Sequence, residues 1–218
     1  MFISFEGGEG TGKSTQVDRL ATRLQDNGYR VLVLREPGAT ALGNYLRKWL
    51  KTAESMTTEA EMYLFAAARA ELVHEMIIPA LEQGKIVVTD RYADSTVAYQ
   101  GYGRGMDIGH IKEVNRIATN GVIPSLTFLL DCDPNIGFAR IAEVAGGSTV
   151  DPINVSRQGE GERFESEPLQ FHHDVRAGFL KIAAEDQARW VVINGELSLD
   201  DIATKIWSEV QQKVGRMQ

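Results

Sequence analysis

Cysteine is almost absent from this 218-residue chain, which has one thiol, Cys132. A single cysteine excludes an intrachain disulfide, and its place after an apolar run indicates a small, partly buried residue. No apolar run approaches the roughly 18 residues that a membrane span needs, and the first residues lack a charged-then-apolar signal pattern. We therefore expect a cytoplasmic protein without membrane association.

An excess of basic residues is also lacking. The chain has 23 Lys and Arg against 30 Asp and Glu, a net charge of −7. Nonspecific binding to a nucleic-acid backbone depends on clustered cations, so no nucleic-acid partner is expected. An anionic ligand would need a local cationic site. The length suits a single domain covering residues 1–218, and a hydrophobic content of 43% is enough for a sizeable core.

Short apolar runs alternate with helical patterns along the chain. Five runs predict buried strands, at residues 2–5, 31–34, 86–89, 126–130 and 190–193. Helical patterns stand at 16–25, at 60–81, after Asp133-Pro134 and after Ser198. This order predicts an α/β fold with a five-stranded parallel sheet flanked by helices, and ligands at the carboxyl ends of the strands. Residues 146–162 are poor in apolar side chains, so a lid is expected at about 144–165.

The glycine-rich stretch GGEGTGKST lies between a predicted strand and a predicted helix. It matches the Walker A pattern, in which backbone N–H groups surround phosphate oxygens and the helix directs its positive end at them. Lys13 would reach the β- and γ-phosphates, and the Ser14 hydroxyl would ligate Mg²⁺. The predicted ATP-binding residues of the loop are Gly7, Gly8, Glu9, Gly10, Thr11, Gly12, Lys13, Ser14 and Thr15.

Glu9 is unexpected inside such a loop, because a carboxylate repels the phosphates that the loop surrounds unless it points elsewhere. Two interpretations follow from the sequence. The side chain either serves a second substrate on the acceptor side or lies in solvent at the loop tip.

Three polar clusters follow the predicted strands: REPG at 35–38, DRY at 90–92 and STVAYQG at 95–101. Because strand ends of a parallel sheet meet at one crevice, these clusters should open toward the phosphate loop. Arg35, Arg91 and Arg69 are planar cations suited to bidentate phosphate contact, as an enzyme with a phosphorylated acceptor requires. Arg69 has an alternative, a salt bridge to a nearby carboxylate. Asp90 fits either an ion pair or a ligand of Mg²⁺-bound water.

Together these pieces resemble the thymidylate kinase family. The matching stretches are EGGEGTGKST, REPG, the helix from Phe65 to Arg69, DRYADSTVAYQG, LLDCDP and RFESEPLQFHHDVRAGFLKIA. The resemblance implies a fold of the P-loop NTPase type with a lid. It also implies ATP-dependent, Mg²⁺-assisted phosphorylation of dTMP to dTDP for dTTP biosynthesis, by a homodimer.

The resemblance further implies a dTMP site. Its residues are Glu36, Pro37, Phe65, Arg69, Arg91, Thr96, Tyr99 and Gln100. Phe65 would stack on thymine and Gln100 would bond the base edge. Arg69 and Arg91 would hold the phosphate, and Tyr99 would crowd the sugar 2′ position. Glu9 would approach the 3′-OH and the phosphates, and Asp90, with Ser14, would organise Mg²⁺.

Phosphoryl transfer needs positive charge at the transferring group. The variable loop positions 8–11 contain no arginine, so the resemblance points to the lid and to Arg157 or Arg163. The first could instead be a solvated loop charge, and Glu162 stands before the second where the family often has Asp. Arg140 would stack on adenine or form a surface salt bridge. The predicted catalytic residues are Lys13, Arg91, Arg163, Arg157 and Glu9.

Two other functions fit parts of the sequence. A deoxynucleoside kinase would need a carboxylate base near the 5′-OH and fewer phosphate-binding arginines. A P-loop switch or regulatory module would leave the arginine clusters and the Tyr99-Gln100 pair unexplained.

Overall fold

The computed structural model describes residues 1–53, 55–144 and 163–215. Its centre is a five-stranded sheet in the order β2-β3-β1-β4-β5, and all four neighbouring pairs are parallel, as predicted. The strands are β1 (Phe2–Glu6), β2 (Val31–Arg35), β3 (Ile86–Asp90), β4 (Leu126–Asp131) and β5 (Trp190–Asn194). The three central strands are almost wholly buried, which explains their continuous apolar sequences.

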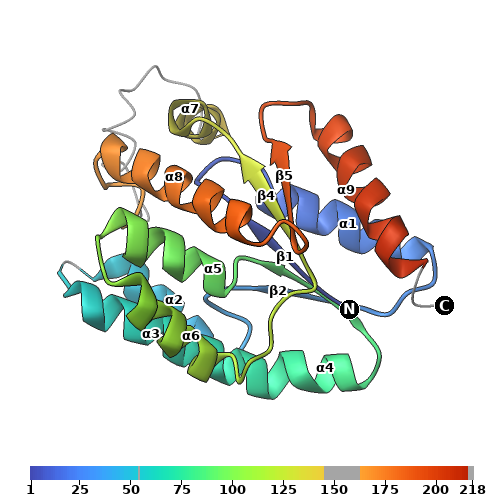
Figure 1. Cartoon of the computed structure of the whole chain (residues 1–218), viewed down its shortest axis with the longest axis horizontal. Coiled ribbons are helices and arrows are strands. Elements are labelled where there is room, and N and C mark those ends of the chain that lie inside the picture. The colour runs from blue at the N-terminus through green and yellow to red at the C-terminus, as the bar shows by residue number, and fades with distance from the viewer. Residues whose placement is uncertain (54, 145–162, 216–218) are drawn as a thin grey trace.

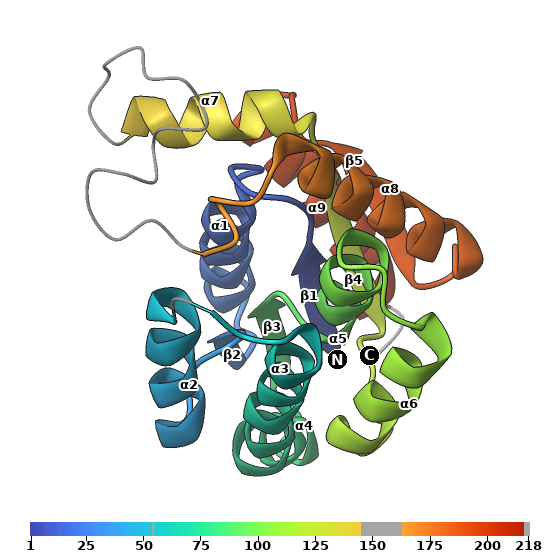
Figure 2. The ribbon, with the colours of Figure 1, turned by 90° about the vertical axis from the view of Figure 1, so that its left-hand side faces the viewer.

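Helices cover both faces of the sheet (Figure 1). On one face lie α1 (Lys13–Asp26) and α9 (Leu199–Val214), which share a core cluster with β1 and β4. The other face carries α3 (Thr58–Leu72), α6 (Ile108–Ala118) and α8 (Leu169–Glu185). The remaining helices are α2 (Ala41–Thr52), α4 (Ile78–Glu82), α5 (Ala93–Thr96) and α7 (Pro134–Val144). Figure 2 shows α2, α3 and α6 in a row, and α3 contacts the other two.

Two helical segments have the wider π-helical spacing: η1 (Val73–Ile77) and η2 (Val97–Gly103). The predicted helix at 60–81 is therefore a continuous run of α3, η1 and α4, which ends at Glu82 before Gly84 in the left-handed region. The last helix begins as predicted, since the Ser198 hydroxyl accepts a hydrogen bond from the Asp201 backbone N–H at 3.1 Å.

Each strand extends one residue beyond its predicted end. The added residues are polar: Glu6, Arg35, Asp90, Asp131 and Asn194. The apolar runs stop before them because the carboxyl edge of the sheet faces a polar crevice.

None of the helices within residues 1–53, 55–144 and 163–215 is long and apolar enough to cross a membrane. Most of the predicted lid lies outside the described residues, which include only its two ends, Val144 and 163–165.

Candidate active site

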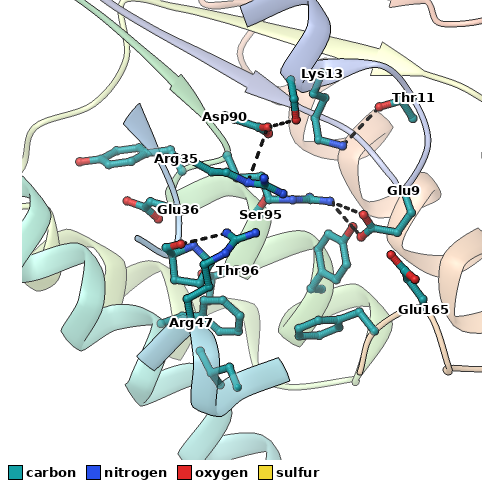
Figure 3. Close-up of a pocket in the computed structure, with 18 of the residues that line it drawn as sticks. Glu9, Thr11, Lys13, Arg35, Glu36, Arg47, Asp90, Ser95, Thr96 and Glu165 are labelled. Carbon is teal, nitrogen blue, oxygen red and sulfur yellow. Dashed lines mark hydrogen bonds and ion pairs between the residues drawn. The ribbon is translucent and has the colours of Figure 1, made fainter. Parts of the chain in front are cut away.

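A cavity of about 310 Å³ opens at the carboxyl edge of the sheet (Figure 3). The phosphate loop forms one end of it, and the DRY segment, α3 and η2 form the other. Of the predicted site residues, the cavity is lined by Glu9, Gly10, Thr11, Gly12, Lys13, Ser14, Thr15, Glu36, Pro37, Phe65, Arg69, Asp90, Arg91, Thr96, Tyr99, Gln100 and Arg163. Strand ends far apart in the sequence therefore meet at one site, as the parallel topology predicted.

The phosphate loop directs Lys13 into this cavity. The Lys13 ammonium donates to the Gly8 carbonyl at 2.5 Å and to the Thr11 hydroxyl at 3.3 Å. Gly12 has a φ of 86°, a conformation that only glycine adopts without strain, and it begins α1. Burial, together with the charge of Arg91, lowers the pKa of Lys13 to about 8. An anion beside Lys13 would raise this pKa again.

The loop also packs on α7 with no side chain between the two backbones. A Cβ atom on Gly137 would lie 2.2 Å from the Glu9 carbonyl oxygen, and one on Gly10 would lie 2.0 Å from the Gly137 carbonyl oxygen. Both distances are far below van der Waals contact. The start of α7 therefore fixes the position of the phosphate loop. The same helix leads directly into the predicted lid.

Glu9 points away from the loop interior and toward Arg91. The Arg91 guanidinium donates to both carboxylate oxygens of Glu9 at 2.9 Å, and the Tyr99 hydroxyl donates to one of them at 2.5 Å. Burial would raise the pKa of Glu9, but Arg91, Lys13 and Tyr99 outweigh it and lower the pKa to about 2. Of the two interpretations of Glu9, the solvated loop tip is wrong.

Arg91 occupies a strained backbone position at the end of β3. Its φ is 69°, uncommon for a residue with a side chain, and its N–H donates to the Phe5 carbonyl at 2.9 Å. The side chain reaches the Gly7 carbonyl at 3.0 Å, so it touches the phosphate loop and the acceptor side together.

Ser14 and Asp90 lie side by side at the base of the cavity. The Ser14 hydroxyl donates to Asp90 Oδ2 at 2.5 Å, and Arg35 Nε lies 3.9 Å from the same oxygen (Figure 3). These are hard oxygen donors of the kind that Mg²⁺ prefers. Within the described ranges, no cluster of three His, Cys, Asp or Glu residues could hold a metal ion. The Ser14 hydroxyl and the Asp90 carboxylate fit a Mg²⁺ ion whose other ligands are phosphate oxygens and water.

Arg69 forms the ion pair that the sequence allowed as its alternative. Its side chain is 1% exposed and donates to Glu36 at 2.9 Å. Further donors reach Asn115 at 2.7 Å and Thr96 at 2.9 Å. Burial raises the pKa of Glu36 to about 7, against the opposing effect of Arg69. Arg69 therefore lines the cavity and holds two other lining residues, Glu36 and Thr96, in place.

Phe65 and Gln100 lie at the end of the cavity away from the phosphate loop, where Phe164 joins them. The rings of Phe65 and Phe164 lie 6.0 Å apart, and Phe164 lies 5.4 Å from the Tyr99 ring. The π-helical turn η2 supplies both Tyr99 and Gln100, and α8 packs against it. This end therefore combines the aromatic rings of Phe65 and Phe164 with the Gln100 amide.

The structure places the predicted residues Arg163 and Arg140 differently, and Arg157 cannot be compared with them. Arg163 lines the cavity and pairs with the buried Glu61 at 2.9 Å, whereas Arg157 lies outside the described residues. Arg140 donates to the Gly195 carbonyl at 2.8 Å and is not among the cavity residues.

Sequence reasoning missed five residues that line the cavity: Arg47, Leu50, Ile141, Phe164 and Glu165. Arg47 comes from α2 and donates to the Pro37 carbonyl at 3.0 Å (Figure 3). No motif surrounds it, so only its position after the REPG cluster could have drawn attention to it. Phe164 stands beside Arg163 in the stretch RFE, which was considered for its arginine alone.

A sequence model described as thymidylate kinase matches residues 5–206. The chain belongs to the thymidylate kinase family. Thymidylate kinases of Thermomicrobium roseum and Solidesulfovibrio magneticus are 45% and 46% identical to it, over 99% and 96% of this chain and 96% and 98% of theirs. The crystal structure of thymidylate kinase from Ehrlichia chaffeensis superposes with a TM-score of 0.75 at 32% identity, covering 97% of this chain and 98% of that one.

The family identifies the reaction and the fold. The chain is a phosphotransferase that uses ATP to convert dTMP to dTDP, as the resemblance implied. The sheet and its helices are the kinase fold of the P-loop NTPases. The two rival interpretations, a deoxynucleoside kinase and a P-loop switch, are therefore wrong.

Proposed function

We propose that the cavity holds ATP and dTMP end to end, with the transferring phosphoryl group between Lys13 and Arg91. One observation carries this assignment: a single cavity is lined at one end by the phosphate loop and at the other by Phe65 and Gln100. Because the acceptor is already an anionic phosphate oxygen, positioning and charge neutralisation suffice, with no covalent intermediate.

On the donor side, the residues from Gly7 to Thr15 surround the ATP phosphates, and the Lys13 ammonium stabilises charge on the β- and γ-phosphates. Ser14 and Asp90 would hold Mg²⁺, which supplies charge compensation to the phosphates. Arg163 or Arg157 would add positive charge at the transferring group. Arg140 would stack on adenine, beyond the cavity and near Gly195.

On the acceptor side, Arg91 and Arg47 hold the dTMP phosphate. Arg69 acts through Glu36 and Thr96, because each of its three guanidinium nitrogens already donates to a protein acceptor. With Pro37, these residues form the wall beside the sugar. Glu9 orients Arg91 and lies within reach of the sugar 3′-OH.

Base and sugar recognition complete the acceptor site. Phe65 stacks on thymine and Gln100 bonds its edge. Tyr99, fixed by its hydrogen bond to Glu9, excludes a 2′-OH.

A homodimer is proposed on the exposed apolar face of α2 and α3. Tyr45 and Trp49 on α2 are 70% and 43% exposed, and Tyr63 on α3 is 50% exposed. The two helices pack against each other, and each exposes large apolar side chains that a second copy of the chain could cover. Sedimentation of the wild type and of Tyr45→Glu tests this; a monomeric wild type would contradict it. Its two nucleotide substrates support a cytoplasmic location for the enzyme.

A coupled assay of ADP release tests the acceptor assignment, with dTMP, dUMP, thymidine and the ribonucleotide of thymine as acceptors. Efficient turnover of dTMP, weak turnover of the ribonucleotide and none of thymidine are expected. If the ribonucleotide were turned over as efficiently as dTMP, the proposal that Tyr99 excludes a 2′-OH would be contradicted.

A further inference from the structure

Glu61 is a fully buried carboxylate that the reaction as described does not use. It lies on α3, one helical turn before Phe65, with an exposure of 0%. It does not line the cavity itself but lies behind Gln100. A carboxylate removed from water is retained only where donors and positive charge compensate it, so its partners show what it is for.

Three side chains donate to Glu61. Gln100 donates from Nε2 to Oε1 at 2.8 Å, and Arg104 donates from Nε to the same oxygen at 2.9 Å and from Nη2 to Oε2 at 3.2 Å. Arg163 reaches Oε2 at 2.9 Å. Because an ionised carboxylate only accepts, the Gln100 atom that faces it must be the amide nitrogen. The amide oxygen of Gln100 is then the atom left for the cavity.

Arg104 holds this arrangement in place. Its guanidinium also pairs with Glu167 at 2.8 Å and lies over the rings of Phe171 and Phe164, at 5.0 Å and 5.7 Å from their centroids. Glu61 therefore keeps a cationic partner even when Arg163 turns to the phosphates. The orientation of the Gln100 amide does not depend on the lid.

We propose that Glu61 is a specificity-determining residue: it fixes the Gln100 amide with its oxygen toward the base and so selects pyrimidines that carry a proton on N3. The inference rests on the proposed contact between Gln100 and the base edge.

Thymine and uracil present an N3–H donor between two carbonyl oxygens, whereas cytosine presents an N3 acceptor. An amide oxygen fixed at this position accepts a hydrogen bond from N3–H of thymine or uracil. With cytosine, the amide oxygen and N3 are both acceptors and face each other without a hydrogen bond. Buried unsatisfied acceptors are costly, so dCMP is rejected. With Glu61→Gln, the amide at position 61 can accept or donate, and the Gln100 amide is free to turn its nitrogen to the base.

The test compares kcat/KM for dTMP, dUMP and dCMP in the wild type and in Glu61→Gln. The ratio of dTMP to dCMP should fall about tenfold or more in the variant, whereas the ratio of dTMP to dUMP should stay the same. Glu167→Gln is the matched control, because it removes the other carboxylate of Arg104 without touching Gln100. Its dTMP to dCMP ratio should equal that of the wild type.

Equal losses for all three substrates in Glu61→Gln would show a merely structural role and overturn the proposal. Gln100→Met tests the proposed contact between Gln100 and the base separately from the role of Glu61. If its dTMP to dCMP ratio equals that of the wild type, Gln100 does not contact the base edge and that part of the proposed site is wrong. If Glu61→Gln does not fold, the wild type still tests the inference with 3-deaza-dUMP, in which C–H replaces N3–H. Turnover of this analogue equal to that of dUMP would overturn it.

Discussion

The phosphate loop and the acceptor pocket share one cavity but are built from different groups. The loop is mostly backbone and glycine, and its shape depends on the close approach of Gly10 and Gly137. The acceptor pocket is made of charged side chains paired across long sequence distances, Arg91 with Glu9 and Arg69 with Glu36. A donor site made from backbone is visible in one contiguous motif, whereas an acceptor site made from pairs is visible only once the chain is folded.

The largest expected effect is at the loop, where a side chain acts on the phosphates. Lys13→Met should lower kcat by about 10³-fold, because one preorganised positive charge is removed from the developing charge. The melting temperature should not fall, since a buried ammonium is replaced by an apolar chain of similar shape. The ADP-release assay and thermal unfolding measure the two. A kcat within tenfold of the wild type would remove Lys13 from the reaction.

Arg163 lines the shared cavity and pairs with Glu61, and its variant tests whether it also acts on the transferring group. Arg163→Ala should lower kcat by about 10²-fold and change the KM for dTMP far less, if the side chain leaves Glu61 to reach the transferring group. Arg116→Ala, which breaks an exposed pair with Glu113, is the control. A kcat within a few fold of the wild type, with a raised KM for dTMP, would assign Arg163 to the Glu61 cluster alone.

A smaller effect is expected at the backbone contact between Gly137 and the phosphate loop, where no charged group is changed. Gly137→Ala places a methyl group against the Glu9 carbonyl, so stability should fall by about 1–3 kcal/mol and the KM for ATP should rise. Gly109→Ala adds the same methyl group to α6, where its nearest neighbour is the Asp107 carboxylate at 3.2 Å. Urea unfolding and ATP kinetics compare the two. Equal behaviour of both variants would show that the loop tolerates displacement.

The last expected effect concerns pH. Glu6 is buried and accepts from the Tyr92 N–H at 2.8 Å and from Ser95 at 2.6 Å; burial, with the charge of Asp94, raises its pKa to about 8. The folded state therefore holds a proton that the unfolded state loses above its ordinary pKa. Stability from this group is present at low pH and is lost as pH rises toward 8.

Glu6→Gln keeps the shape of the protonated side chain without titrating. Its stability relative to the wild type should grow between pH 5 and 8, by at most about 1.4 kcal/mol per pH unit. Urea unfolding at four pH values measures this. Parallel pH curves for the two proteins would contradict the raised pKa.

The strands and the phosphate loop could be predicted because their signals are local. Short apolar runs and the Walker A motif each lie within ten residues, and both were confirmed by the sheet and by the position of Lys13. The strand ends were each one residue short, since a polar residue at the carboxyl edge interrupts an apolar pattern. Those residues include Glu6, Arg35 and Asp90. The end of an apolar run therefore predicted the end of the strand one residue too early, at the edge of the sheet where the site begins.

The acceptor pocket was harder because its geometry depends on distant partners. The partner of Gln100 is 39 residues away and that of Arg104 is 43 residues away, so neither pair has a sequence signal. Arg47 was missed because α2 carries no motif. The π-helical spacing of η2 depends on packing against α8, where a Cβ atom on Gly103 would lie 2.6 Å from the Phe171 ring. Local propensity does not encode such a contact.

The π-helical turn has a consequence for comparing related chains. The Arg104 N–H donates to the carbonyl of Tyr99, five residues earlier, so η2 holds one residue more than an α-helical turn would. Deleting one of residues 101–103 would return this turn to α-helical spacing and place Gln100 three residues before Arg104 instead of four. A one-residue gap in an alignment at residues 101–103 therefore indicates a chain in which the side chains around Glu61 are arranged differently.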